Sequence, residues 1–220
     1  MRTLAATAFL PAAAPQPLGD DAIHLWLFRP WRGPPQGAAE SALVRQLLGG
    51  YLQRRPDELE FRRGEHGKPR LADDALQFNL AHSGDALLLA LSRNQALGVD
   101  LELPRRPRPA LELAARYFDA GETTALARLP AALQEAAFLG LWSCKEAVLK
   151  AHGGGIGFGL ERAVFALDGK GRVARMLGFA SGSSGERWHV VRLDLAADVS
   201  AALAWQGRDL QVQAFMQMSV

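Results

Sequence analysis

The stretch WSCKEAVLK, Trp142 to Lys150, lies inside the longest helical pattern of the chain, Ala131 to His152. This pattern is rich in Ala and Leu, follows Pro130 and ends before three consecutive glycines, which are common start and stop signals of a helix. At about 100° per residue its apolar side chains share one arc, which we expect to face the core. Lys145 stands in the middle of this arc. The arc comprises Phe138, Leu141, Trp142, Val148 and Leu149, with Cys144 packed at its edge.

Lysine is rare in this chain. Of the 25 basic residues 21 are Arg, and the four lysines are Lys68, Lys145, Lys150 and Lys170. A lysine has a readily shifted pKa and binds phosphate as a point charge, so its use here is consistent with proton transfer or phosphate binding, with chance retention as the alternative. Lys145 either reaches past the apolar arc to water or meets a bound anion in a cleft. Glu146 and Lys150 are four residues apart, so they form either a helix ion pair or part of a site.

Length and composition restrict the class of protein. The chain has 220 residues, enough for one large domain or two small ones, with 49% hydrophobic and 22% charged residues. A net charge of +2 argues against bulk nucleic-acid binding but allows an anionic small molecule. The single cysteine excludes an internal disulfide and indicates a reducing compartment, so we expect a cytoplasmic protein. No apolar stretch has transmembrane length, and residues 1–17 read as a loose leader, with a targeting segment as the alternative.

Internal similarity indicates two related halves. Residues 85–102 and 198–215 are both 18 residues long, and each reads as strand, polar turn, strand. We therefore expect an α+β fold with an N-terminal half at 1–103 and a C-terminal half at 104–220, joined by the linker PRRPRP at 104–109. Periodicity predicts further helices at 38–51, 110–118 and 122–129, and strands at 22–28, 78–80, 86–91, 98–102, 163–167, 173–179, 188–195, 199–205 and 210–215.

Two carboxylates stand out in the strand GVDLE. Asp100 and Glu102 share one face of this strand, about 6.5–7 Å apart between α carbons, so both side chains can bind one hard cation with a third ligand. Mg²⁺ suits such oxygen ligands, and the alternative is a solvated polar strand face. The aligned positions of the second half are Gln213 and Phe215, so the pair occurs once and predicts a single active site.

Four stretches together resemble the 4′-phosphopantetheinyl transferases, of the longer monomeric type exemplified by the surfactin-synthetase activator. They are GKP (67–69), FNLAHSG (78–84), GVDLE (98–102) and WSCKEAVLK (142–150), and RYFDAGE (116–122) looks like the family's linking segment. The resemblance covers about residues 22–165. It implies a monomer built as a pseudo-dimer of two similar α+β halves with antiparallel sheets, and an active site between the halves.

The resemblance also implies the activity. A protein of this family transfers the 4′-phosphopantetheine arm of coenzyme A to a serine of an apo acyl or peptidyl carrier protein and releases 3′,5′-ADP. Asp100, Glu102 and Glu146 would hold Mg²⁺, with Mn²⁺ possible. Glu146 and Lys150 would be catalytic, with Glu146 taking the serine proton directly or through a water. The implied coenzyme A contacts are Arg45, Lys68, His82, Ser83, Lys145 and Lys150.

One departure concerns the connection RPWRGPPQG at 29–37, which is shorter than in family members of this type. Arg29 and Arg32 are therefore candidates for the missing coenzyme A contacts. Carrier docking is expected near Arg116 to Thr124, because carrier domains present acidic helices and basic flanks suit them. The docking residues would be Tyr117 and Phe118 for apolar contact and Arg105, Arg106 and Arg108 for charge.

Two other classes of function remain open from the residues alone. A non-catalytic module that binds coenzyme A or a nucleotide would need Arg45, Lys68 and His82 but neither Glu146 nor Lys150. A nucleic-acid-binding protein would use the arginine-rich stretches and would show a steep salt dependence. Taken singly, His82 could be a packed structural histidine, and Lys68 could be an exposed lysine in a loop.

Overall fold

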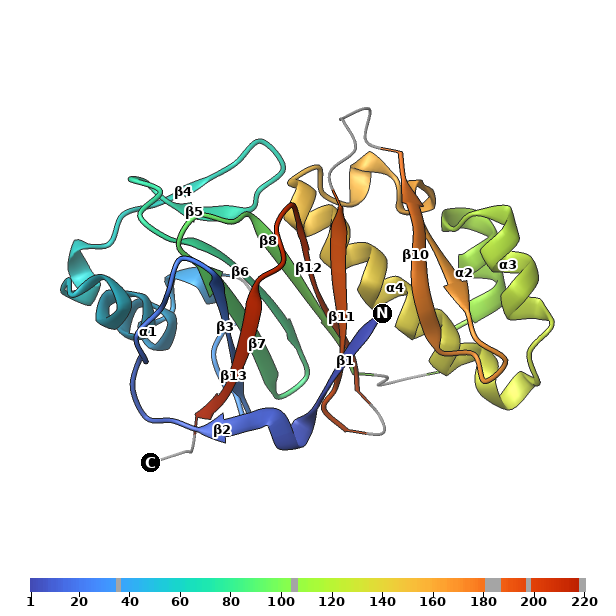
Figure 1. The fold of residues 1–220 in the computed structure, drawn as a ribbon, viewed down its shortest axis with the longest axis horizontal. Helices are drawn as coiled ribbons and strands as arrows, with labels where there is room; N and C mark the ends of the chain where they lie inside the picture. The colour runs from blue at the N-terminus through green and yellow to red at the C-terminus, as the bar shows by residue number, and fades with distance from the viewer. Residues whose placement is uncertain (35–36, 104–106, 181–186, 197–198, 218–220) are drawn as a thin grey trace.

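The structure, a computed structural model, describes residues 1–34, 37–103, 107–180, 187–196 and 199–217. These residues form two main sheets that lie face to face (Figure 1). The five-stranded sheet has the order β2 (Phe9–Pro11), β13 (Gln211–Gln217), β3 (Ala22–Phe28), β7 (Ala86–Ser92) and β6 (Gln77–Ser83). The four-stranded sheet has the order β1 (Arg2–Ala5), β11 (Trp188–Asp194), β12 (Ser200–Gln206) and β8 (Leu97–Glu102). Two hairpins complete the strands, β4 (Phe61–Arg63) with β5 (Pro69–Leu71) and β9 (Ala163–Leu167) with β10 (Val173–Phe179).

Helices cover the outer face of each sheet. The helix α1 (Ala42–Leu52) packs on the five-stranded sheet, and α4 (Ala131–His152) packs on the four-stranded sheet. The shorter α2 (Ala110–Tyr117) and α3 (Ala120–Ala127) lie beside α4. Single 3-10 turns occur at Ala6–Ala8, Ala38–Glu40, Pro56–Glu58, Ile156–Phe158 and Leu160–Arg162. The order of layers is therefore helix, sheet, sheet, helix.

Strand alternation explains how one sheet supplies two cores. Along β12, Leu203 and Trp205 point into the core between the sheets, whereas Ala202 and Ala204 contact the α4 side. Along β8, Val99 and Leu101 enter the core between the sheets. Successive strand residues face opposite sides, so the alternate residues Gly98 and Asp100 face α4.

The two repeated segments exchange strands. The first supplies β7 to the five-stranded sheet and β8 to the four-stranded sheet, and the second supplies β12 to the four-stranded sheet and β13 to the five-stranded sheet. The expected mixed α+β fold rich in antiparallel pairs is confirmed, although β1 pairs with β11 in parallel and β13 pairs with both β2 and β3 in parallel. The pseudo-dimer and the boundary at residue 103 stay predictions.

Most predicted elements are confirmed, and the bounds of α4, β3, β9 and β10 are those predicted. The prediction that residues 1–17 form a loose leader is wrong, because residues 2–5 and 9–11 are strands that add to the edges of both sheets. Phe9 is 6% exposed, so its burial between the sheets helps to hold this segment in place.

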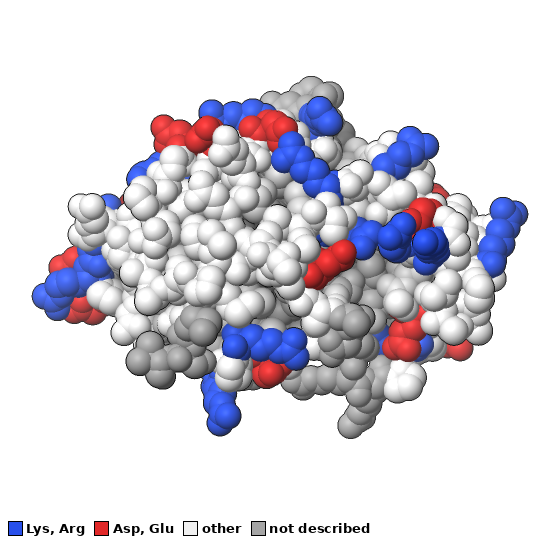
Figure 2. Space-filling view, turned by 60° about the horizontal axis from the view of Figure 1, so that its bottom comes forward, with Lys and Arg blue, Asp and Glu red and all other residues white. Residues whose placement is uncertain are grey.

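The surface carries both signs of charge. On the face in Figure 2, basic and acidic side chains of the described residues are intermixed around a broad uncharged area. Among these residues, no helix combines the length and the hydropathy that a membrane crossing requires.

Candidate active site

The site forms where α4 crosses β8, and Gly98 sets how closely the two approach. A Cβ at position 98 would lie 2.2 Å from the backbone oxygen of Ala147 and 2.4 Å from the backbone nitrogen of Ala151. No larger side chain fits between strand and helix at that distance. The glycine of GVDLE therefore brings the last turns of α4 onto the strand that carries the acidic pair.

This approach joins Asp100 to Lys150. The Lys150 Nζ donates to Asp100 Oδ1 at 2.7 Å, and the Lys150 side chain keeps 27% of its surface exposed. Asp100 is 5% exposed, and its Oδ2 atom is buried without a hydrogen-bond partner. Burial lowers the pKa of the Lys150 ammonium, but the carboxylates of Asp100, Glu146 and Glu102 outweigh this effect and raise it above its usual value. The ammonium therefore stays charged in the site.

Glu146 is the second buried carboxylate. It is 5% exposed, and its Oε1 atom is also without a partner. Burial raises the pKa of Glu146 to about 7, and the nearby charges of Asp100 and Glu102 add to this increase while Lys150 opposes it. A carboxyl with a pKa near neutrality can exchange a proton at physiological pH, which suits a general base.

Glu102, the third carboxylate, has a partner. Its Oε2 accepts a hydrogen bond from Arg108 Nη2 at 2.7 Å. Burial and the charge of Asp100 raise the pKa of Glu102, while Arg108 lowers it. Arg108 was expected to serve carrier docking, and the structure instead places its guanidinium on this predicted metal ligand.

The three carboxylates fit a metal ion by their chemistry but not by their arrangement. Within the described ranges, no three His, Cys, Asp or Glu side chains are arranged so that they could hold a metal together. The donor chemistry nevertheless fits a hard cation, because all three groups are carboxylates and two of them present buried, unpartnered oxygens. Asp100, Glu102 and Glu146 are therefore suitable ligands by type, and Glu102 is engaged by Arg108.

Lys68 lies beside this cluster. Its Nζ donates to the backbone oxygen of Leu97 at 2.8 Å and to that of Lys150 at 2.7 Å. The first oxygen belongs to the start of β8 and the second to the end of α4, so Lys68 joins the two elements of the site. Burial and the charge of Lys150 lower the pKa of Lys68 to about 8. The alternative prediction, that Lys68 is an exposed loop lysine, does not fit these contacts.

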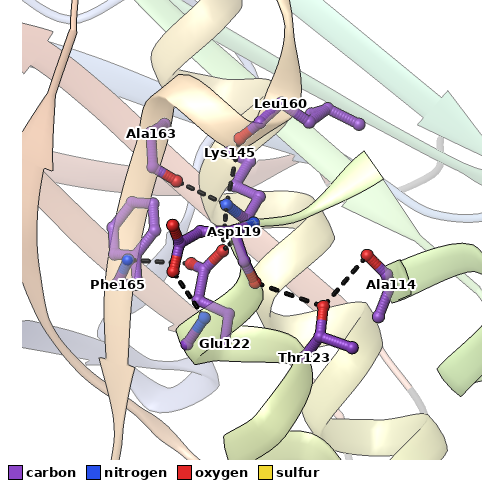
Figure 3. Close-up of polar contacts among 9 residues, drawn as sticks. Ala114, Asp119, Glu122, Thr123, Lys145, Leu160, Ala163 and Phe165 are labelled. Atoms are coloured by element: carbon purple, nitrogen blue, oxygen red, sulfur yellow. Dashed lines mark hydrogen bonds and ion pairs between the residues drawn. The ribbon is translucent and has the colours of Figure 1, made fainter. Parts of the chain in front are cut away.

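Lys145 does not reach the site. It is 0% exposed, and its ammonium contacts Glu122 Oε2 at 2.6 Å and the backbone oxygens of Leu160 at 3.0 Å and Ala163 at 2.5 Å (Figure 3). The ammonium also stands 4.7 Å from the centre of the Phe118 ring. The expectation that Lys145 faces a coenzyme A phosphate is therefore wrong, because every polar contact of this group is made inside the core. The predicted burial of the arc around it is confirmed for Phe138, Leu141, Cys144, Val148 and Leu149.

Glu122 was missed as a partner for Lys145. Its Oε1 accepts from the backbone nitrogen of Phe165 at 2.8 Å, and its Oε2 accepts from that of Asp119 at 3.1 Å. Asp119 and Glu122 form a capping box at the start of α3, and this spacing signals the start of a helix but not the contact with Lys145. Burial raises the pKa of Glu122 and lowers that of Lys145, and each partner opposes the shift of the other.

Two of the predicted coenzyme A contacts have structural partners. The Arg45 guanidinium donates to the backbone oxygens of Glu40, Pro56 and Leu59 at 2.9–3.1 Å. The Ser83 Oγ accepts from the backbone nitrogen of Leu103 at 3.1 Å. Ser83 thus ties β6, at the edge of the five-stranded sheet, to the end of β8.

His82 lines a separate hollow. Its ring lies 5.3 Å from that of Trp31, and it borders a cavity of about 420 Å³ with Arg63, Pro69 and residues 37–39. Larger hollows of about 640 and 730 Å³ lie at β10–β11 and beside the first half of α4, and neither is lined by Asp100, Glu102 or Glu146. Pro69, which lines the hollow at His82, follows Lys68 directly in the sequence.

The remaining predicted contacts are dispersed. Arg29 pairs with Asp85 at 3.3 Å, and Arg32 is exposed. Arg105 and Arg106 lie outside the described residues. Phe118 is 6% exposed and stacks on Phe138 at 5.1 Å between ring centres, so its expected role in apolar docking is wrong. Tyr117 is only partly buried.

Comparison with known proteins bears on the same region. Residues 96–204 match the model of the 4′-phosphopantetheinyl transferase superfamily. The 4′-phosphopantetheinyl transferase HetI of Nostoc sp. is 38% identical over 122 residues, which are 54% of this chain and 52% of HetI. The 4′-phosphopantetheinyl transferase Sfp of Bacillus subtilis is 33% identical over 135 residues, or 60% of this chain and 58% of Sfp. For the 4′-phosphopantetheinyl transferase AcpT of Salmonella typhimurium the identity is 37% over 123 residues, or 54% of this chain and 62% of AcpT.

The chain thus spans between half and two thirds of the length of these curated relatives. The matched region contains Asp100, Glu102, Glu146 and Lys150, whereas Arg45, Lys68, His82 and Ser83 precede it. The resemblance predicted from the motifs is confirmed: residues 96–204 of this chain match the model of the 4′-phosphopantetheinyl transferase superfamily, and relatives that carry this name are 33–38% identical to it.

Proposed function

We propose that this protein transfers the 4′-phosphopantetheine arm of coenzyme A to a serine of an apo acyl or peptidyl carrier protein and releases 3′,5′-ADP. The relatives whose names state this kind of activity support the proposal. The observation that carries it is the pair of buried, unpartnered carboxylate oxygens on Asp100 and Glu146 beside the charged Lys150. Such a site offers places for both a cation and an anionic phosphate.

Asp100, Glu102 and Glu146 would hold Mg²⁺, or Mn²⁺ in its place. When bound there, the ion would neutralise negative charge on the pyrophosphate of coenzyme A. Two unpartnered oxygens in the cluster support this assignment, since a buried polar atom without a partner is costly.

The protein's own groups would perform the proton transfer and stabilise the charge. Glu146 would accept the serine proton, directly or through a water, as the serine oxygen attacks the β-phosphorus. The bond between that phosphorus and the bridging oxygen breaks, and 3′,5′-ADP leaves with the electron pair. The Lys150 ammonium would stabilise the new charge on the leaving phosphate.

The nucleotide end of coenzyme A would extend from Lys68 toward the hollow at His82. His82 and Arg63 support this direction, since both line a cavity of about 420 Å³ and Arg63, paired with Glu40, brings positive charge to it. Arg29 and Arg32 remain proposed additional contacts. Arg45 and Ser83 would act by holding the backbone of this region, because both are bonded to it.

The two repeated segments support a pseudo-dimeric origin, because they exchange strands reciprocally. In this proposal residues 1–103 carry the coenzyme A side and the acidic strand, and residues 104–220 carry the catalytic helix. Carrier proteins would dock near α2 and α3, where Arg116 and Tyr117 remain accessible. We expect a cytoplasmic monomer.

The test is a mass measurement on apo carrier proteins incubated with coenzyme A, Mg²⁺ and the enzyme. We expect a gain of one phosphopantetheine on at least one carrier type, and loss of this gain with Asp100→Asn and with Lys150→Gln. Circular dichroism would show that both variants are folded. Tight coenzyme A binding without any gain across fatty acid, polyketide and peptide carriers would favour a non-catalytic binding module instead.

A further inference from the structure

Arg108 is the residue of the site whose role the proposed function leaves unassigned. Its guanidinium contacts Glu102 Oε2 at 2.7 Å, and the two side chains are 31% and 20% exposed. Its backbone nitrogen donates to Glu135 Oε1 of α4 at 3.0 Å. Arg108 is therefore fixed by its backbone beside the helix, while its side chain reaches β8 through a partly hydrated ion pair.

The pair occupies one of the two carboxylate oxygens of a proposed metal ligand. A carboxylate oxygen that accepts a short, charge-assisted hydrogen bond from a guanidinium has less electron density to offer a metal ion. A guanidinium and a divalent cation held by the same carboxylate would also repel each other. Because both side chains remain partly exposed, water can replace the hydrogen bond if the pair separates.

We propose that Arg108 is a built-in counter-ion of Glu102 that a divalent cation displaces when it binds Asp100, Glu102 and Glu146. This inference rests on the proposed function, since it concerns the metal site assigned there. Arginine suits the role because its guanidinium is always charged, binds carboxylates through a planar fork and is weakly hydrated. The pair neutralises Glu102 without a metal and limits the affinity for one.

A different geometry predicts the opposite effect. If Glu102 bound the metal through Oε1 while Oε2 kept its bond to Arg108, the arginine would orient the ligand. Removing a side chain that orients a metal ligand typically weakens metal affinity about 10–100-fold. Displacement predicts tighter binding without Arg108, so the sign of the change separates the two geometries.

The experiment is a Mn²⁺ titration of the full chain, followed by the electron paramagnetic resonance of free Mn²⁺. We expect Arg108→Gln to lower the Kd for Mn²⁺ about three- to tenfold, as an ion pair of this exposure implies. Arg108→Lys keeps the charge but loses the fork, and its Kd should lie between those of the wild type and Arg108→Gln. The matched control is Arg2→Gln, which removes the same charge from an exposed ion pair with Asp209 at the opposite edge of the four-stranded sheet and should leave Kd unchanged.

An unchanged or higher Kd in Arg108→Gln overturns the displacement, even if metal and transfer activity are otherwise as proposed. Wild-type protein that binds no Mn²⁺, or whose binding survives Asp100→Asn, overturns the metal site and this inference together. Circular dichroism of each variant guards against a folding defect, and Arg108→Lys gives the answer if Arg108→Gln does not fold.

Discussion

Gly98→Ala tests the contact between β8 and α4, on which the site geometry depends. The added Cβ would lie 2.2 Å from the Ala147 oxygen and 2.4 Å from the Ala151 nitrogen, whereas ordinary contact begins at 3.4 Å. Both atoms belong to the backbone of a packed helix, so α4 has to withdraw by roughly 1 Å. The bond between Asp100 and Lys150, now 2.7 Å, would then exceed hydrogen-bonding distance.

We expect this overpacking to lower the free energy of unfolding by about 1–3 kcal/mol. The rate of carrier modification should fall by about 100-fold, because a displacement of roughly 1 Å between reacting groups has an effect of that order. Urea denaturation followed by tryptophan fluorescence measures the first quantity, and intact-protein mass spectrometry of the carrier over time measures the second.

Gly140→Ala is the matched control, since it makes the same change within α4. Its Cβ would lie 3.5 Å from Val173 Cγ2, an ordinary contact. Replacing glycine inside a helix should stabilise the protein by about 0.5–1 kcal/mol and leave the transfer rate unchanged. A Gly98→Ala protein with both the stability and the rate of the wild type would refute the close approach of β8 and α4.

Three further results are expected. Lys145→Met leaves the Glu122 carboxylate, which is 1% exposed, without its cation, so urea titration should show that the free energy of unfolding falls by about 3–5 kcal/mol. Adding Glu122→Gln in a double variant should restore part of this loss, and a loss below about 1 kcal/mol in Lys145→Met would contradict the buried pair. Burial raises the pKa of Glu146 from 4.5 to about 7, so its contribution to the free energy of unfolding is complete below pH 4.5 and is lost as the pH rises through 7. In the presence of a chelator, the free energy of unfolding of the wild type should fall over this range by an amount of order 3 kcal/mol more than that of Glu146→Gln. Identical pH profiles of the two proteins would contradict this prediction. Asn79→Ala removes the side-chain oxygen that accepts a hydrogen bond from the Val99 backbone nitrogen at 2.8 Å. Urea titration should show that the free energy of unfolding falls by about 1–3 kcal/mol, and an unchanged value would argue against this link between β6 and β8.

The sequence predicts elements best where a local pattern and its boundaries agree. The bounds of α4 follow from Pro130, from the apolar arc and from Gly153, which ends the helix at a φ of 87°. The strand β7 is buried at every position, which agrees with its nearly continuous apolar run. By contrast, β1 and β2 are short and pair with β11 and β13, which lie near the other end of the chain, so no local pattern marks them.

The contact partners of the site's side chains were harder to predict from the sequence than its helices and strands. The periodicity correctly placed Lys145 among buried residues, but it does not reveal that Glu122, on a separate helix, meets the ammonium there. The same limit applies to Arg108, whose place in an arginine- and proline-rich linker resembles a solvated docking segment rather than the counter-ion of Glu102. Packing between distant segments decides these contacts.

Crystals grown with coenzyme A and Mn²⁺ provide the most direct test of the proposed active site. Diffraction near the manganese absorption edge should show one anomalous peak about 2.0–2.3 Å from carboxylate oxygens of Asp100, Glu102 and Glu146, with the pyrophosphate on its open side. Bound coenzyme A with the manganese peak absent from this position, or held by other residues, would contradict the account.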